Sequence, residues 1–298
     1  MFGWRVGAFL KLLSLIVILI ATLLYYLSMN PSMSHRSDSV IAIQPQGDVA
    51  NGAYLARISG CIACHTDTKN PSGLVSGAPL KSSFGVFYAP NLSADKEWGI
   101  GNWSLADFST AVREGVSPTG EHYYPAFPYE FFSNFSDQDI RDLWAAFQSV
   151  PANAKRAQSS EIDFPYNLKF SLPLWKRLYQ LDNSVNTDQL QLQRGQFLVE
   201  VAGHCAACHT PRNILGALQQ DQWLQGVIAN EGGAPPITKE ALLLNGWDSA
   251  DLAYAFKTGI KPDGDVFGAK MQEIIEQGTQ FMSEADRLAM ADYLLEIE

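Results

Sequence analysis

Two copies of one five-residue pattern decide how this chain folds: CIACH at residues 61–65 and CAACH at residues 205–209. Both read C-x-x-C-H, the pattern through which a haem of the c type is attached. The two thiols bond to the haem vinyl groups, and the adjacent histidine becomes the proximal ligand of the iron. The two copies use all 4 cysteines of the chain. We therefore expect two covalent haem c groups, attached through Cys61, Cys64, Cys205 and Cys208, with His65 and His209 on the irons.

Other uses of paired cysteines fit less well. A structural zinc site would bring its two pairs closer in sequence, whereas these copies are 205 − 61 = 144 residues apart. A thioredoxin-like redox pair requires a βαβ context and no histidine after the second cysteine. Cysteines within one turn seldom form a structural disulfide. The pattern favours haem over all three.

The offset of 144 residues extends beyond the cysteines. It also relates Trp103 to Trp247 and Gly115 to Gly259, which indicates an internal repeat. Capping patterns at Ser104, Ser136, Asp248 and Ser283 predict amphipathic helices in both copies, and no strand-like alternation stands out. With 298 residues there is room for two cores. We predict an all-α fold of two tandem class I cytochrome c-like domains, at residues 48–150 and 188–298.

Residues 151–187, between the copies, are rich in aromatic and apolar side chains. We expect this inter-domain bridge to pack across both domains and to fix the distance between the haems. Residues 31–47 are polar, contain two prolines and several serines, and are predicted to be a tether.

The first 30 residues contain a long apolar stretch. No charge occurs from Leu12 to Leu27, and residues 6–27 are long enough to cross a bilayer core of about 30 Å as a helix. A cleaved signal peptide is the alternative, but no alanine pair follows the apolar run. The basic residues Arg5 and Lys11 precede or interrupt that run, which predicts a single-pass anchor in a bacterial cytoplasmic membrane with the haem domains facing the periplasm.

The charge balance narrows the choice of partners. Without Arg5 and Lys11, 19 of the 21 basic residues remain against 31 acidic residues, a formal charge of −12. Nucleic acid is excluded as a partner because its binding needs a basic surface. An acidic redox protein is suited to a basic docking patch, although the charge also maintains solubility.

The sixth ligand of each iron is predicted from the same offset. Met271 follows His209 by 62 residues and is expected to bind the second iron; Met282 and Met290 fall near the last helix, where methionine usually fills a core. At 271 − 144 = 127 the first copy has Phe127, and no methionine occurs between Ser34 and Lys270. His122 is the imidazole available to the first iron. The alternative is a five-coordinate haem with Phe127 on an open distal side.

Several loops carry a family resemblance: APNL at residues 89–92, GIGNWS at 99–104, YPAFPY at 124–129 and GHCAACHTPRN at 203–213. Over residues 48–298 the chain resembles the membrane-bound cytochrome c subunits of periplasmic alcohol, aldehyde and gluconate dehydrogenases. In that family the loop containing Phe127 often carries a methionine ligand, and well-known members have three haems.

The resemblance implies electron relay from a periplasmic dehydrogenase subunit to quinone, another cytochrome or a terminal oxidase. The chain contains no catalytic triad, dinucleotide-binding fingerprint or phosphate loop, so a non-enzymatic subunit is favoured. A di-haem peroxidase with an open first haem is the alternative, in which Glu121 or His122 would be the distal acid or base. A gas sensor is a third, although no output domain is visible.

Overall fold

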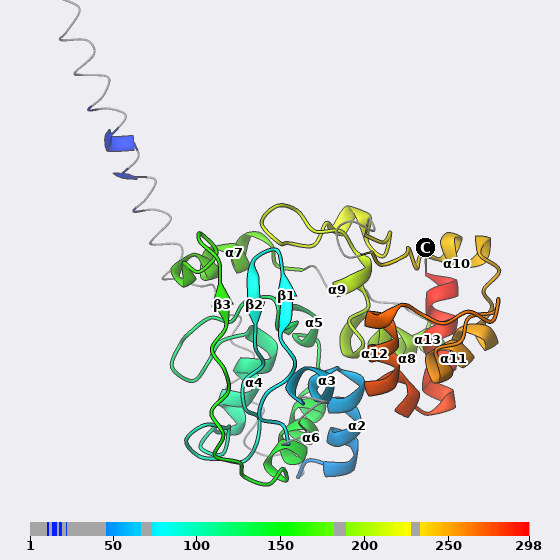
Figure 1. The fold of residues 1–298 in the computed structure, drawn as a ribbon, viewed down its shortest axis with the longest axis horizontal. Coiled ribbons are helices and arrows are strands. Elements are labelled where there is room, and N and C mark those ends of the chain that lie inside the picture. The colour runs from blue at the N-terminus through cyan, green and yellow to red at the C-terminus, as the bar shows by residue number, and fades with distance from the viewer. Residues whose placement is uncertain are drawn as a thin grey trace, which may run out of the picture.

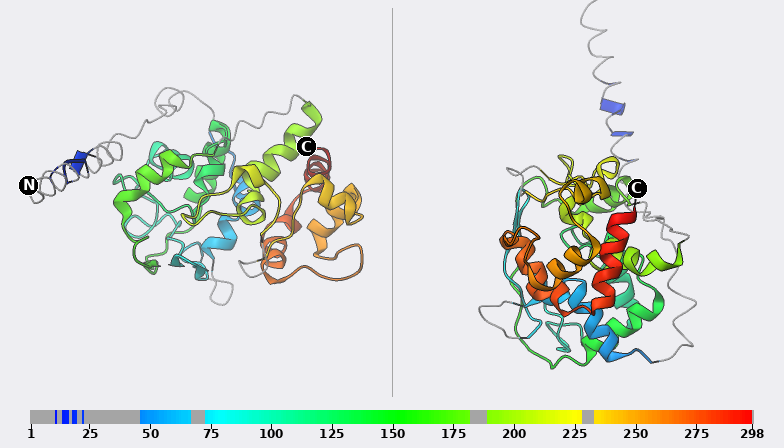
Figure 2. Two further views of the ribbon diagram at one scale, coloured as in Figure 1. Left: turned by 90° about the horizontal axis from the view of Figure 1, so that it is seen from above. Right: turned by 90° about the vertical axis from the view of Figure 1, so that its right-hand side faces the viewer.

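The computed structural model describes residues 46–66, 73–181, 189–227 and 233–297, and in the N-terminal stretch Lys11, residues 14–16 and 18–19, and Thr22 (Figure 1). Within this part the fold is helix-rich, as predicted. The N-terminal half and the C-terminal half lie side by side in Figure 1 and in the left-hand view of Figure 2. Each half contains one of the C-x-x-C-H motifs.

The N-terminal half contains five helices in its described residues. They are α2 (Val49–Ile58), α3 (Cys61–His65), α4 (Leu105–Glu114), α5 (Tyr129–Phe132) and α6 (Asp137–Gln148). The predicted capping boxes at Ser104 and Ser136 are confirmed, because each serine accepts from the backbone N–H three residues on and that residue's carboxylate accepts in return.

The C-terminal half repeats this arrangement. Its helices are α8 (Leu190–Gln196), η2 (Phe197–Ala202), α9 (Ala206–His209), η3 (Gln220–Gln222), α10 (Lys239–Leu244), α11 (Ser249–Thr258), α12 (Ala269–Gln277), η5 (Thr279–Phe281) and α13 (Glu284–Glu296). Asp248 and Ser283 cap α11 and α13 as predicted.

A small antiparallel sheet departs from the all-α prediction. It has three strands, β1 (Leu80–Ser82), β2 (Gly85–Phe87) and β3 (Glu161–Ile162), in the order β1-β2-β3. Strands of two or three residues are too short to show an alternating pattern in the sequence. The sheet ties the start of the bridge to the N-terminal half, since β3 lies within residues 151–187 and pairs with β2.

The single-pass membrane location does not hold. Among the residues that the structure describes, no helix is long and apolar enough to cross a bilayer. A span requires about 20 consecutive apolar residues in one continuous helix. Of the apolar stretch that suggested an anchor, only the isolated residues named above are described, and they form no such helix. The predicted tether, up to residue 45, lies outside the described residues.

Each half is built on a crossing of two helices at a glycine. Helix α2 packs against α6, and α8 packs against α13. A Cβ atom at Gly52 would overlap the carbonyl oxygen of Asp142 in α6, and one at Gly195 would overlap that of Ala289 in α13. Only glycine lets the two backbones approach this closely. The helix that leads into each motif is therefore fixed by backbone contact with the last helix of its half.

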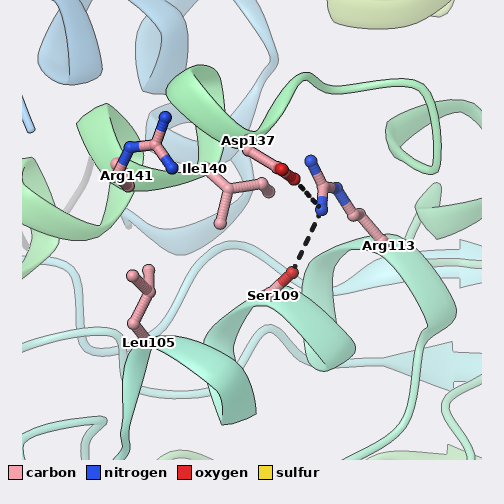
Figure 3. Close-up of a pocket in the computed structure, with 6 residues that line it drawn as sticks. All are labelled: Leu105, Ser109, Arg113, Asp137, Ile140 and Arg141. Atoms are coloured by element: carbon pink, nitrogen blue, oxygen red, sulfur yellow. Dashed lines mark hydrogen bonds and ion pairs between the residues drawn. The ribbon is translucent and has the colours of Figure 1, made fainter. Parts of the chain in front are cut away.

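A small hollow between α4 and α6 is lined by side chains of both helices (Figure 3). Arg113 of α4 forms a 2.8 Å ion pair with Asp137 at the start of α6, and its guanidinium also donates to the carbonyl oxygen of Phe135. These contacts hold the two helices together on the outside of the N-terminal half.

Direct contacts join the two halves. Tyr54 of α2 donates to Asp286 of α13 at 2.5 Å, and Arg194 of α8 donates to the same carboxylate at 2.8 Å. The guanidinium of Arg57 lies 4.2 Å from the centre of the Phe281 ring. Buried residues of both halves belong to one continuous hydrophobic core.

The bridge also contacts both halves through η1 (Lys169–Ser171) and α7 (Leu172–Leu178). Trp175 Nε1 donates to the Leu215 carbonyl oxygen at 2.8 Å in the C-terminal half. Lys176 Nζ donates to the carbonyl oxygens of Glu114 and Gly115, which end α4 in the N-terminal half. The bridge is thus packed across the halves where it is described, as its composition predicts.

We predict that Gly52→Ala destabilises the holoprotein by about 1–3 kcal/mol, because the added methyl group meets the backbone of α6. Helix propensity alone would give the opposite sign, a gain of up to about 1 kcal/mol. The measurement is the free energy of unfolding in denaturant. Ala53→Ser, at the next and exposed position of α2, is the control and should change it by less than about 0.5 kcal/mol. A more stable Gly52→Ala variant would contradict the crossing geometry.

Candidate haem sites

The first motif forms the short helix α3 directly after α2. Gly60 separates the two helices with φ = 72°, a left-handed conformation that favours glycine. Cys61 and Cys64 are three residues apart and so lie on one face of the turn. Both are free thiols, as are Cys205 and Cys208 in the second motif. All four thiols are therefore available for bonding to a haem edge.

The imidazole of His65 is prepared to bind a metal. It is 7% exposed, and its Nδ1–H donates to the carbonyl oxygen of Pro90 at 2.7 Å. Burial lowers the pKa of His65 to about 4, against the opposing effect of this hydrogen bond. The ring is consequently neutral, and its proton sits on Nδ1, which leaves the Nε2 lone pair free for iron.

The second motif has the same arrangement on α9. His209 Nδ1–H donates to the carbonyl oxygen of Pro235 at 2.7 Å, and burial lowers the pKa of this histidine too. The guanidinium of Arg212 donates to the carbonyl oxygens of Ala207 and Gly216, and so links the motif to the loop that follows it. The sequence analysis did not predict the two proline carbonyls as partners, because any residue type can supply a backbone oxygen. The only indication in the sequence was that each proline follows its histidine at nearly the same distance.

The residues present therefore fit a haem c at each motif. Each site combines two unpaired thiols on one helical turn with a neutral histidine held by a backbone carbonyl, which is how iron-ligating histidines are normally oriented. The described residues contain no cluster of three or more metal-binding side chains.

The structure brings the two motifs together. A Cβ atom at Gly60, just before the first motif, would lie 3.8 Å from the imidazole of His204, just before the second. His204 itself has φ = 36°, rare for a residue with a side chain. Its ring packs against Phe131 and Phe132 of α5, at centroid distances of 5.9 and 5.5 Å. The haem-bearing turns of the two halves are thus neighbours across the shared core.

Met271 is in the first turn of α12, which packs against α3 of the first motif, and its side chain contacts the shared core. Burial raises the pKa of Cys208, and the charges of Arg212 and Lys270 oppose this. Burial also raises the pKa of Cys64, as does the charge of Glu273. Met271 stays the predicted ligand of the second iron, while Met282 and Met290 are buried in the core.

The loops that precede the predicted sixth-ligand positions, Phe127 and Met271, match at the offset of 144. Isolated bridges pair Val116 with His122 and Ile260 with Val266. This match makes Phe127 the counterpart of Met271. The Phe127 ring packs with the aromatic rings of Tyr123, Tyr129 and Phe132, at centroid distances of 6.1, 6.4 and 5.8 Å.

His122 lies at the base of the same loop. Burial lowers its pKa, and the nearby ammonium of Lys176 in the bridge lowers it further. Within the part of the chain that the structure describes, its Nδ1 is buried without a hydrogen-bond partner. The structure thus places His122 beside α7, and its assignment to the first iron stays a prediction.

Two covalent haems on paired C-x-x-C-H turns define a c-type cytochrome, and the comparisons agree. The chain is 35% identical over 267 residues to a diheme cytochrome c-type protein of Cereibacter sphaeroides, covering 87% of this chain and 89% of that protein. It belongs to the family of diheme c-type cytochromes and carries two covalently bound haem c groups.

Longer relatives are cytochrome subunits of dehydrogenases. The chain is 33% identical to the fructose dehydrogenase cytochrome subunit of Gluconobacter japonicus and 32% identical to the gluconate 2-dehydrogenase cytochrome c subunit of Pantoea cypripedii. The matches cover 89% and 83% of this chain but only 54% and 58% of those proteins. No family model matches the chain.

We predict that the double substitution Cys61→Ser, Cys64→Ser reduces the haem content from two per chain to one. Mass spectrometry of the denatured protein measures this, because only thioether-linked haem survives denaturation. The matched double substitution Cys205→Ser, Cys208→Ser should also leave one haem. Retention of two haems in either variant would disprove attachment at these thiols.

Proposed function

We propose that this protein is an electron-transfer subunit that accepts electrons from the catalytic subunit of a dehydrogenase. Its two haems pass them to quinone, another cytochrome or a terminal oxidase. The observation that carries the proposal is the juxtaposition of the two haem motifs across one continuous core. The cytochrome subunits of fructose and gluconate dehydrogenases, which it resembles over most of its length, support a dehydrogenase as the donor.

In this proposal the haems are attached through Cys61, Cys64, Cys205 and Cys208, and residues 48–150 and 188–298 form two tandem cytochrome c-like domains. A bound haem contributes an iron that alternates between the ferric and ferrous states. The protein holds each proximal imidazole neutral and oriented through a proline carbonyl. The packed bridge keeps the two halves in place through Trp175 and Lys176.

The net charge of −10 supports a donor or acceptor with a basic docking surface. Complementary charge mainly raises the rate of encounter and makes it sensitive to salt. A peroxidase with an open first haem receives less support. Glu121, one candidate distal acid, forms an ion pair with Lys169 of η1 on the surface, with both side chains about half exposed.

We predict that the oxidised holoprotein is reduced by a dehydrogenase catalytic subunit from the same organism when its substrate is added, and that the reduced protein is reoxidised by a soluble quinone analogue. Stopped-flow absorbance of the haems measures both steps. The rate of the first step should fall as ionic strength rises. A protein that instead turns over hydrogen peroxide rapidly, and exchanges no electrons with any such subunit, would contradict the relay.

We further propose that Met271 binds the second iron and His122 the first. The reduced wild type should then bind no carbon monoxide, whereas Met271→Leu and His122→Ala should each open one haem to it. Absorbance changes on adding carbon monoxide measure this. If the wild type already binds one equivalent and His122→Ala binds no more, the first haem is open and Phe127 lines its distal side. Met282→Leu, a change in the core, is the control and should bind none.

A further inference from the structure

Glu200 is an acidic side chain buried in apolar surroundings close to the second motif. It is 9% exposed, and its neighbours in η2 are core residues, from Leu198 and Val199 to Val201 and Ala202. Cys205 follows five residues later. Burial, and after it the charge of the Glu200 carboxylate, raises the pKa of the Cys205 thiol to about 12. Glu200 directly follows Val199, whose carbonyl oxygen accepts the backbone N–H of Cys205 at 3.0 Å. The fold therefore places Glu200 close to the second haem's attachment point.

A local insertion places Glu200 there. Gly52 precedes Cys61 by nine residues, whereas Gly195 precedes Cys205 by ten. Both glycines are fixed at helix crossings, so the extra residue must be absorbed between the crossing and the motif. The segment η2 absorbs it as a π-helix. Short π-helical segments are rare in proteins, and many of those that occur lie at functional sites. Five residues before Cys61 the first half has Ala56, which is buried in the core.

The carboxylate is hydrogen-bonded only by neutral groups in the described part of the chain. Trp223 Nε1 donates to its two oxygens at 3.1 and 3.3 Å, and Tyr293 Oη donates to Oε1 at 3.3 Å. Burial raises the pKa of Glu200, and these two hydrogen bonds oppose the rise. Burial and the charge of Glu200 in turn raise the pKa of Tyr293.

Both cations of the helices packed on η2 have other partners, and the remaining charged residues of those helices are acidic. Arg194 of α8 is paired with Asp286 of α13. Arg287 of α13 donates to the carbonyl oxygen of Met282. Glu130 of α5 is itself acidic, and burial raises its pKa to about 7. No described cation is in contact with the Glu200 carboxylate to stabilise its negative charge. The proton affinity of Glu200 is therefore sensitive to any change of charge nearby.

We propose that Glu200 is a redox-linked proton site for the second haem. With a haem bound there, Glu200 would take up one proton from water on one-electron reduction and return it to water on reoxidation. The physical reason is that reduction removes one positive charge close to a carboxylate in a low-dielectric environment, which favours its protonated form. This inference rests on a haem at Cys205 and Cys208 but not on the dehydrogenase partner, because equilibrium potentials are measured without one.

The test is a potentiometric titration of the holoprotein over a range of pH, followed by haem absorbance. Over the interval between the pKa values of Glu200 in the two oxidation states, the potential of the second haem should fall with rising pH. The limiting slope is about 59 mV per pH unit, which corresponds to one proton taken up for each electron. The interval should lie above the ordinary glutamic acid pKa of about 4.3. The first haem should show no such slope from this group.

In the variant Glu200→Gln the potential of the second haem should no longer depend on pH over this interval. Glu296→Gln removes the same charge from an exposed position on α13 and should leave the slope intact. The single-haem variant that keeps only Cys205 and Cys208 identifies which of the two potentials belongs to the second haem. A wild-type potential independent of pH across this interval, or a slope that survives in Glu200→Gln, would overturn the proposal.

A second measurement does not depend on that variant folding. The infrared difference spectrum of the wild type, reduced minus oxidised, should show a protonated carboxyl group appearing on reduction. Trp223→Phe removes a hydrogen bond that stabilises the carboxylate, so the pH interval of the slope should move upward. No carboxyl signal in the wild type, together with an unmoved interval in Trp223→Phe, would also refute the proposal.

Discussion

The close contact of two backbones at a glycine positions everything else in each half of this molecule. Gly52 meets α6 and Gly195 meets α13 so closely that a single methyl group would not fit. Gly52 lies on α2, which ends just before the first C-x-x-C-H turn, and Gly195 lies on α8, which η2 continues toward the second. The crossing therefore sets where the thiols emerge and where the proximal histidine meets its proline carbonyl. The haem sites are consequences of helix packing as much as of the cysteine pattern.

The two halves share this plan but differ around their haems. The second half has Met271 where the first has Phe127 among aromatic rings, and a buried glutamate where the first has alanine. Axial ligation, charge and solvent access are the properties through which a protein sets haem potential. The two halves thus share one scaffold and differ in the side chains around their motifs.

The sequence was sufficient for those features that depend on local chemistry. The cysteine pattern predicted two haems, and the side chains at Ser104, Ser136, Asp248 and Ser283 predicted helix starts that the structure confirms. It failed where the outcome depends on atoms distant in the chain. The carbonyl of Pro90, the approach of His204 to Gly60 and the surroundings of Glu200 come from tertiary packing. Hydropathy suggested a membrane span, but hydropathy alone does not establish one continuous helix.

The continuous core has a consequence for how the molecule meets solvent. Buried residues of both halves belong to one apolar cluster, and Tyr54 and Arg194 bind the same carboxylate of Asp286 from opposite halves. Opening either half would expose apolar surface of the other, so we expect the two halves to loosen together. The stability of the two motif-bearing halves is therefore a shared property of the described core, although Cys64 and Cys208 are themselves exposed.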